Sequence, residues 1–182
     1  MNFLALPFPV VPVATLFMEA YNETILEQEP QGGSAMLGSN TVTQIGFVVK
    51  DIEQAARDWA ALLGVPVPDI IITDEMDKSQ TVYRGQPSPA RAKLAFFHLG
   101  QVSLELIEPD GNPSTWQECL DEKGEGVHHI AFNVQGMGEN IAMLGSHGLQ
   151  CVQKGEYTGG RYAYLDAADN KFKVVFELLE ND

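Results

Sequence analysis

Two matching stretches decide the fold: Gln44-Ile45-Gly46-Phe47-Val48-Val49 and His129-Ile130-Ala131-Phe132-Asn133-Val134. Both are rich in residues that favour β-structure, and their apolar residues alternate, which predicts half-buried strands. A second match joins 104–108 (LELIE) to 176–180 (FELLE). Because the two kinds of strand recur in the same order, the chain carries an internal repeat, whose two modules are expected to pack together into one core.

Working outward from these strands gives the order of elements in each module. Residues 51–63 have apolar side chains at helical spacing and are followed by Gly64, which predicts a helix after the first strand. The fold class expected is α+β, with two tandem βαβββ modules forming a cup-shaped mixed sheet. Module one spans 41–110, a linker helix 113–124 and module two 125–182. We predict strands at 43–49, 70–73, 81–84, 93–99, 102–108, 128–134, 150–154, 162–166 and 172–179, and a second-module helix at 137–146.

The composition excludes several classes of protein. Of 182 residues, 45% are hydrophobic, and 11 Lys+Arg against 25 Asp+Glu give a net charge of −14. This charge disfavours binding to nucleic acid or to anionic membranes, and it counts mildly against a polyphosphate substrate. The two cysteines, Cys119 and Cys151, form no C-x-x-C motif, so neither a zinc knuckle nor a disulfide scaffold is indicated. A cytoplasmic location is expected.

Residues 1–40 are interpreted as an extension and linker, which can be poorly ordered and can dock on the domain or on a neighbouring chain. Residues 1–17 are apolar like a signal peptide, but no Lys or Arg precedes Lys50, so the basic n-region is missing. Pro7, Pro9 and Pro12 would also break a helical apolar region. A start at Met18 or Met36 is an alternative.

Alternation along the strands predicts where polar side chains meet. Side chains in a strand point alternately to opposite faces, and on four strands the face turned away from the helices carries one polar group. Two carboxylates, an imidazole and an amide form a mixed nitrogen and oxygen set, which suits Zn, Ni, Co, Mn or Fe. Taken alone, each of these residues is more simply interpreted as a solvent-exposed or structural residue than as a metal ligand. Because the four positions agree with the internal repeat, the set together favours a metal site. The four are Gln44, Glu105, His129 and Glu177.

The other histidines have simpler interpretations. By the same alternation His128 lies on the face that packs on a helix, so a structural or supporting role is expected. His98 lies on a strand that can line the cup, and His147 lies beside the glycine that ends a helix.

The paired modules and these strand motifs resemble the vicinal oxygen chelate (VOC) superfamily, in its methylmalonyl-CoA epimerase and glyoxalase I-like branch. The resemblance covers roughly 41–180 and implies the glyoxalase/bleomycin resistance/dioxygenase fold, with one divalent metal bound by the four residues above. Methylmalonyl-CoA epimerases usually have His where this chain has Gln44, whereas some glyoxalase I enzymes have Gln. The chain also lacks the two-His, one-carboxylate iron site of extradiol dioxygenases.

The resemblance implies an isomerase, epimerase or lyase that works through a metal-stabilised enediolate. Glu177 is the expected base, since a carboxylate that leaves the metal can take and return a proton. A second acid or base is expected among Glu105, His98 and Tyr83. The substrate-contact candidates are His98, Arg161, Tyr162 and Tyr164.

Two other function classes are open. One is a metal-free small-molecule binding protein of the antibiotic-sequestering type, and the other is a non-catalytic VOC paralogue that keeps the metal. For the enzyme we expect a small oxygenated substrate, a homodimer, and no nucleic-acid or membrane partner.

Overall fold

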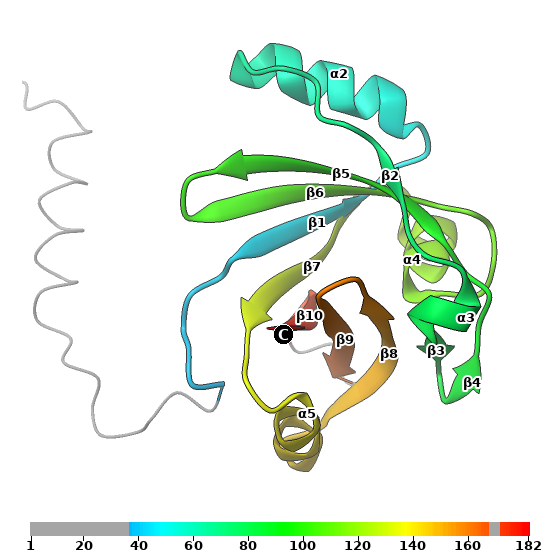
Figure 1. Cartoon of the computed structure of the whole chain (residues 1–182), viewed down its shortest axis with the longest axis vertical. Helices are drawn as coiled ribbons and strands as arrows, with labels where there is room; N and C mark the ends of the chain where they lie inside the picture. The colour runs from blue at the N-terminus through cyan, green and yellow to red at the C-terminus, as the bar shows by residue number, and fades with distance from the viewer. Residues whose placement is uncertain (1–36, 168–171) are drawn as a thin grey trace, which may run out of the picture. The chain divides into compact units, whose positions relative to one another are not determined.

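The computed structural model describes residues 37–167 and 172–182. Within these residues ten strands form one curled, mixed sheet in the order β2-β5-β6-β1-β7-β10-β9-β8-β3-β4 (Figure 1). The predicted α+β class is thereby confirmed. The strands are β1 (Gln44–Val48), β2 (Ile71–Ile72), β3 (Val82–Tyr83), β4 (Gln86–Pro87), β5 (Ala92–Leu99), β6 (Val102–Pro109), β7 (Gly126–Asn133), β8 (Leu149–Tyr157), β9 (Gly160–Ala167) and β10 (Val175–Asn181); the helices are α2 (Ile52–Leu63), α3 (Met76–Ser79), α4 (Thr115–Lys123) and α5 (Met137–Ser146).

The internal repeat is visible in the strand pairing. In the first half β1 runs parallel to β6, and in the second half β7 runs parallel to β10. The two parallel pairs join through an antiparallel seam between β1 and β7. Gly46 lies opposite Glu105 in one pair, and Ala131 lies opposite Glu177 in the other. The two glutamates therefore occupy equivalent places on either side of the seam.

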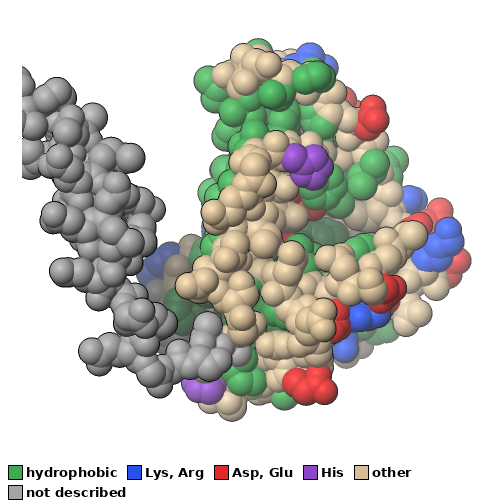
Figure 2. Space-filling view, turned by 60° about the vertical axis from the view of Figure 1, so that its left-hand side comes forward, with side chains coloured by type: hydrophobic (Ala, Val, Ile, Leu, Met, Phe, Trp, Pro, Cys, Tyr) green, Lys and Arg blue, Asp and Glu red, His purple; other side chains and the backbone are tan. Residues whose placement is uncertain are grey.

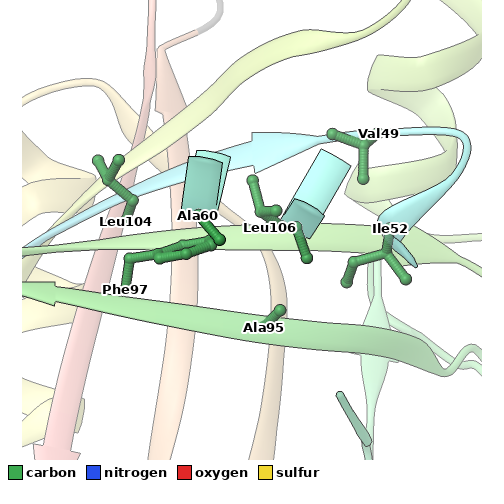
Figure 3. Packing of buried hydrophobic residues seen from close by; sticks show 8 residues of the cluster. Val49, Ile52, Ala60, Ala95, Phe97, Leu104 and Leu106 are labelled. Carbon is green, nitrogen blue, oxygen red and sulfur yellow. The ribbon is translucent and has the colours of Figure 1, made fainter. Parts of the chain in front are cut away.

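Helix α2 covers the outer face of the first half. Asp51 caps its start by accepting a hydrogen bond from the Gln54 amide, and Gly64 ends it with φ of 66°, in the left-handed region that glycine adopts readily. The buried face of α2 packs on the sides of β5 and β6 that point away from the cup (Figure 3). This cluster contains Val49, Ile52, Ala56, Ala60, Ala95, Phe97, Leu104 and Leu106.

Helix α4 has a different place, inside the curl of the sheet. Its Trp116 and Cys119 pack on Val48, Ile107 and Val175, which share strand faces with the predicted metal-site residues. Ser114 caps this helix by accepting from the Gln117 amide. The linker helix between the modules therefore closes one end of the cup. Helix α5 covers the outer face of the second half, where its Leu144 packs with Leu149 and Leu165.

The hairpin β3–β4 belongs to the half of the sheet formed by the second module. The sequence predicts the strand at 81–84 as part of module one, but β3 pairs antiparallel with β8, with Val82 opposite Lys154. The amide of Arg84 adds a hydrogen bond to the Val152 carbonyl, 2.8 Å away. This pairing covers the edge that β8 would otherwise expose.

Residues 1–36, and with them almost all of the predicted extension, lie outside the described residues, as does the 168–171 segment before β10. Among the described residues no helix is long and apolar enough to cross a membrane.

The core on which α2 packs gives a stability test. Leu106 is fully buried in this cluster, so Leu106→Ala is expected to lower the free energy of unfolding by about 2–5 kcal/mol. Leu62→Ala is the matched control, because Leu62 is 77% exposed and its loss is expected to change stability by about 0.5 kcal/mol or less. Urea unfolding followed by circular dichroism measures both; equal destabilisation by the two variants would contradict this packing.

Candidate metal centre

The four residues predicted as ligands come together at the β1–β7 seam. The Nε2 atom of Gln44 donates to Glu105 Oε2 at 2.7 Å and reaches Glu177 Oε2 at 3.5 Å. The Nε2 atom of His129 lies 3.0 Å from Glu177 Oε2 and 3.4 Å from Glu105 Oε2. Ligand atoms of Glu105, His129 and Glu177 all lie within 4.8 Å of one another, as donors around a single cation must.

Burial makes this cluster costly unless its charges are compensated. His129 is completely buried, and Glu105 and Glu177 are 5% and 3% exposed. Burial raises the pKa of Glu105, because a carboxylate loses its hydration there. Two adjacent buried carboxylates need a cation between them. A divalent metal bound by mixed oxygen and nitrogen donors would meet that need, so the residues fit the ion implied by the sequence.

The position of His129 depends on a glycine across the seam. Gly46 lies opposite His129, and the imidazole ring occupies the space where a side chain at position 46 would begin. A Cβ there would overlap the Cε1, Nδ1 and Nε2 atoms of the ring. Only glycine at this strand position leaves room for the imidazole.

His128 also contacts the centre, although the alternation of side chains predicts it on the helix-packing face. A β-bulge in β7 opposite Gly46 and Phe47 inserts one residue into the strand and changes the alternation at this point. The His128 ring packs on Tyr164, with centroids 5.1 Å apart, and its Nδ1 lies 3.0 Å from Nδ1 of His129. The predicted face was wrong, because a bulge is not visible in the apolar pattern.

The two histidines fix each other's ring orientation. Burial and the neighbouring His129 lower the pKa of His128, so His128 is neutral and its Nδ1 can accept a hydrogen bond from Nδ1–H of His129. Nε2 of His129 is then left facing the carboxylates. Burial alone would lower the pKa of His129, but the charges and hydrogen bonds of Glu177 and Glu105 outweigh it and raise this pKa to about 10.

A cavity of about 490 Å³ opens onto the candidate ligands. Gln44, Glu105 and Glu177 line its inner part, and its walls come from both halves of the sheet, α4 and the segment around α3. A hollow with hydrophobic side chains inside it is visible between the two halves of the domain in Figure 2. Tyr162 and Tyr164, two of the predicted substrate contacts, are among the lining residues.

The other predicted substrate contacts lie elsewhere. Arg161 is on the opposite face of β9 from Tyr162 and Tyr164, where it pairs with Glu180 at 3.0 Å and Asp182 at 2.8 Å. His98 is exposed near the end of β5, where its Nδ1 lies 3.0 Å from Ser103 Oγ.

Tyr83, considered as a second acid, donates to Glu118 at 2.9 Å and is not among the lining residues. Of the acid or base candidates considered beside Glu177, Glu105 is therefore the one that lines the cavity.

Several residues that line the cavity are not among the predicted site residues. Trp116 belongs to the predicted linker helix, whose sequence gives no reason to expect this side chain in the site. It lines the cavity and donates from Nε1 to the Tyr164 hydroxyl at 3.1 Å. Phe96 shares its face of β5 with His98, and strand alternation alone would have identified it. Tyr157 lies in the extension of β8 beyond its predicted end.

Comparison with known proteins decides the family. The family model described as "Glyoxalase/Bleomycin resistance protein/Dioxygenase superfamily" matches residues 43–164. The chain belongs to this superfamily. The superfamily's curled half-barrel sheet is the fold described above, and the predicted VOC resemblance is confirmed.

Individual relatives agree on the fold. The uncharacterized protein YqjC of Bacillus subtilis is 30% identical over 115 residues, which are 63% of this chain and 72% of that protein. The hypothetical protein BH1468 of Bacillus halodurans has a TM-score of 0.56 at 23% identity, covering 79% of this chain and 96% of the other. Methylmalonyl-CoA epimerase of Mycobacterium tuberculosis has a TM-score of 0.54 at 17% identity, covering 84% and 94%.

The Gly46–His129 contact predicts a specific loss of metal affinity. Gly46→Ala places a methyl group against the imidazole and displaces a ligand, so the affinity for Zn²⁺ or Mn²⁺ is expected to fall at least about tenfold. Gly138→Ala is the matched control, since a Cβ at position 138 meets nothing within 4 Å. Isothermal titration calorimetry (ITC) of metal-stripped protein measures both variants; wild-type affinity in Gly46→Ala would contradict the proposed role of His129.

Metal binding is expected to release protons. With a pKa of about 10, His129 is protonated at pH 7.5 in the metal-free protein, and its Nε2 must lose that proton to bind a cation. Below pH 10 the apparent affinity is therefore expected to rise with pH. ITC in buffers of different ionisation enthalpy, calibrated with a chelator, is expected to show about one proton released per ion; release of none would exclude His129 as a ligand.

Proposed function

We propose that this protein is a divalent-metal-dependent isomerase, epimerase or lyase that moves the α-proton of a small oxygenated carbonyl compound. The observation that carries the proposal is the convergence of four side chains, Gln44, Glu105, His129 and Glu177. Gln44, Glu105 and Glu177 also line a cavity of about 490 Å³. A cavity of this size suits a small molecule. Methylmalonyl-CoA epimerase has the same fold, and its name describes a reaction of this type.

The four residues of the cluster have different proposed roles in the reaction. Gln44, Glu105, His129 and Glu177 would hold the ion, which when bound supplies positive charge to stabilise the oxygens of an enediolate. Glu177 lies at the cavity surface and is the proposed base, taking the α-proton on a carboxylate oxygen and returning it to the same or a neighbouring carbon. Glu105, on the equivalent strand of the other half, is the proposed second acid or base.

Tyr164 is the residue proposed to orient the substrate. Its hydroxyl accepts the Trp116 indole proton at 3.1 Å, which leaves its own O–H as a donor. Burial raises the pKa of Tyr164, helped by the charges of Glu177 and Glu105, so the hydroxyl stays protonated. Tyr162 lies beside it, and its hydroxyl accepts from Gln153 Nε2 at 3.2 Å. Both hydroxyls are held in place by buried partners.

The cluster itself argues against a metal-free binding protein. Without a cation, the buried carboxylates of Glu105 and Glu177 rely on one imidazolium and one amide for compensation. In a protein that binds its ligand without a metal, these buried charges would lower stability and would contribute nothing to binding. The proposal therefore requires stoichiometric divalent metal in purified protein, and elemental analysis showing none would overturn it.

Isotope exchange tests the catalysis. Metal-loaded protein in D₂O is expected to catalyse deuterium incorporation at the α-carbon of at least one compound in a panel of 2-oxo thiohemiacetals, acyl-CoA thioesters and keto-sugars, followed by NMR. Glu177→Gln, assayed at saturating metal, is expected to slow this exchange by about 100-fold or more, because it removes the base.

Glu122→Gln provides the matched control, being the same chemical change at an exposed position of α4. If the metal-loaded protein exchanges no member of the panel, it is a non-catalytic member of the superfamily.

A further inference from the structure

His128 is a buried polar residue to which the proposed reaction gives no role. It is 3% exposed and is not among the described residues that line the cavity. Within residues 37–167 and 172–182 its Nε2 atom has no hydrogen-bond partner. A buried polar atom without a partner lowers stability. Because an apolar side chain of similar size would avoid this cost, the imidazole at this position requires an explanation.

The bulge in β7 directs this residue toward the metal centre. Gly46 lies opposite His129, and the next residue of β1 lies opposite Val127. His128 is therefore the inserted residue, with no partner on β1. In a regular strand consecutive side chains point to opposite faces, whereas here the Nδ1 atoms of two consecutive imidazoles lie 3.0 Å apart. Bulges that redirect a side chain are typical of strands next to functional sites.

The chemistry of a ligating histidine fixes the direction of this hydrogen bond. Nε2 of His129 faces Glu177 at 3.0 Å and Glu105 at 3.4 Å. When Nε2 binds a cation it carries no hydrogen, so the one N–H of the neutral ring is at Nδ1. Nδ1 of His128 must accept this hydrogen, and the N–H of His128 is then at Nε2. The unpartnered nitrogen is thus a consequence of using the other nitrogen as an acceptor.

Aromatic neighbours hold the acceptor in place. The His128 ring lies edge-on to the His129 ring, with centroids 5.2 Å apart, and edge-on to Tyr164 at 5.1 Å. Tyr164 is itself fixed, because its hydroxyl accepts from Trp116 Nε1 at 3.1 Å. A half-turn of the His129 ring would bring Cδ2 against this acceptor in place of Nδ1 and would lose the hydrogen bond.

We infer that His128 is the positioning residue of the metal centre: it accepts the Nδ1 hydrogen of His129, holds Nε2 of that ring toward the carboxylates and so raises the affinity for the ion. The inference rests on the metal centre of the proposed function. It goes further because it assigns metal affinity to a residue that is neither a ligand nor part of the cavity wall. Such a partner of a ligating histidine typically changes metal affinity by a factor of about 10–100.

Three variants separate the hydrogen bond from the packing of the ring. The side-chain oxygen of asparagine is as many bonds from Cβ as Nδ1 of histidine, so His128→Asn keeps an acceptor. His128→Leu has a similar size and no acceptor, and His128→Gln keeps an amide but places it one bond farther out. His98→Leu makes the same change at an exposed histidine of β5 and is the matched control. Circular dichroism checks that each variant is folded.

The affinity for Zn²⁺ is measured by competition with a chromophoric chelator at a single pH. His128→Leu and His128→Gln are expected to bind at least about tenfold more weakly than wild type, and His128→Asn to stay within about threefold of it. His98→Leu is expected to match wild type. Wild-type affinity in both variants that lose the acceptor would overturn the inference. An equal loss in His128→Asn would also overturn it, because ring packing and not the hydrogen bond would then be responsible. If His128→Leu does not fold, the comparison of Asn with Gln gives the same decision.

Nitrogen NMR of zinc-loaded protein gives a readout that a purely structural role would not change. With ¹⁵N-labelled histidine, His129 is expected to bind zinc through Nε2 and to carry a hydrogen on Nδ1 that is shifted downfield by its acceptor. This hydrogen is expected to move upfield and exchange faster with solvent in His128→Leu, and to stay near its wild-type position in His128→Asn. Zinc on Nδ1 of His129, or a hydrogen on Nδ1 of His128, would overturn the inference.

Neither measurement depends on turnover, so the two proposals fail separately. If His128→Leu loses zinc affinity but the isotope-exchange panel shows no reaction, the proposed function fails and the role of His128 stands. If the panel shows exchange with metal-loaded wild-type protein but His128→Leu and His128→Gln bind zinc as wild type does, the role of His128 fails and the proposed function stands.

Discussion

The buried contact of two carboxylates with one imidazole is the constraint around which this domain is arranged. Glu105, His129 and Glu177 lie within 4.8 Å of one another in an environment with almost no solvent. Because buried charge is tolerated only when compensated, the surrounding structure must hold these groups in register. The parallel β1–β6 and β7–β10 pairs do this from both sides of the seam, and Gly46 provides the space that the imidazole needs.

Much of this arrangement was predictable from the sequence because it is local or repeated. The helix at Ile52–Leu63 follows from its cap, its apolar spacing and Gly64. The four candidate ligands follow from alternation along strands that occupy equivalent places in the two modules, and Tyr162 and Tyr164 share one face of β9 for the same reason. Alternation also separates Arg161 from these tyrosines, so the sequence contained the evidence that placed Arg161 away from the cavity.

Other features depend on contacts between distant segments and were not predictable. The bulge at His128 arises because β7 has one more residue than β1 at the seam, and no feature of the apolar pattern marks it. Tertiary packing determines that β3 pairs with β8 and that the side chain of Trp116 points into the cup. The identity of the substrate is equally non-local, because it depends on which side chains from seven strands, two helices and their connecting loops surround one space.

The hairpin that crosses to the second half of the sheet also bears on how the domain folds. Since β3 lies against β8, the second module cannot complete its own edge, and neither module is a self-sufficient folding unit. A chain with so many contacts between remote segments is expected to fold slowly and in a single cooperative step. The internal repeat in the sequence therefore does not mark two units that fold separately.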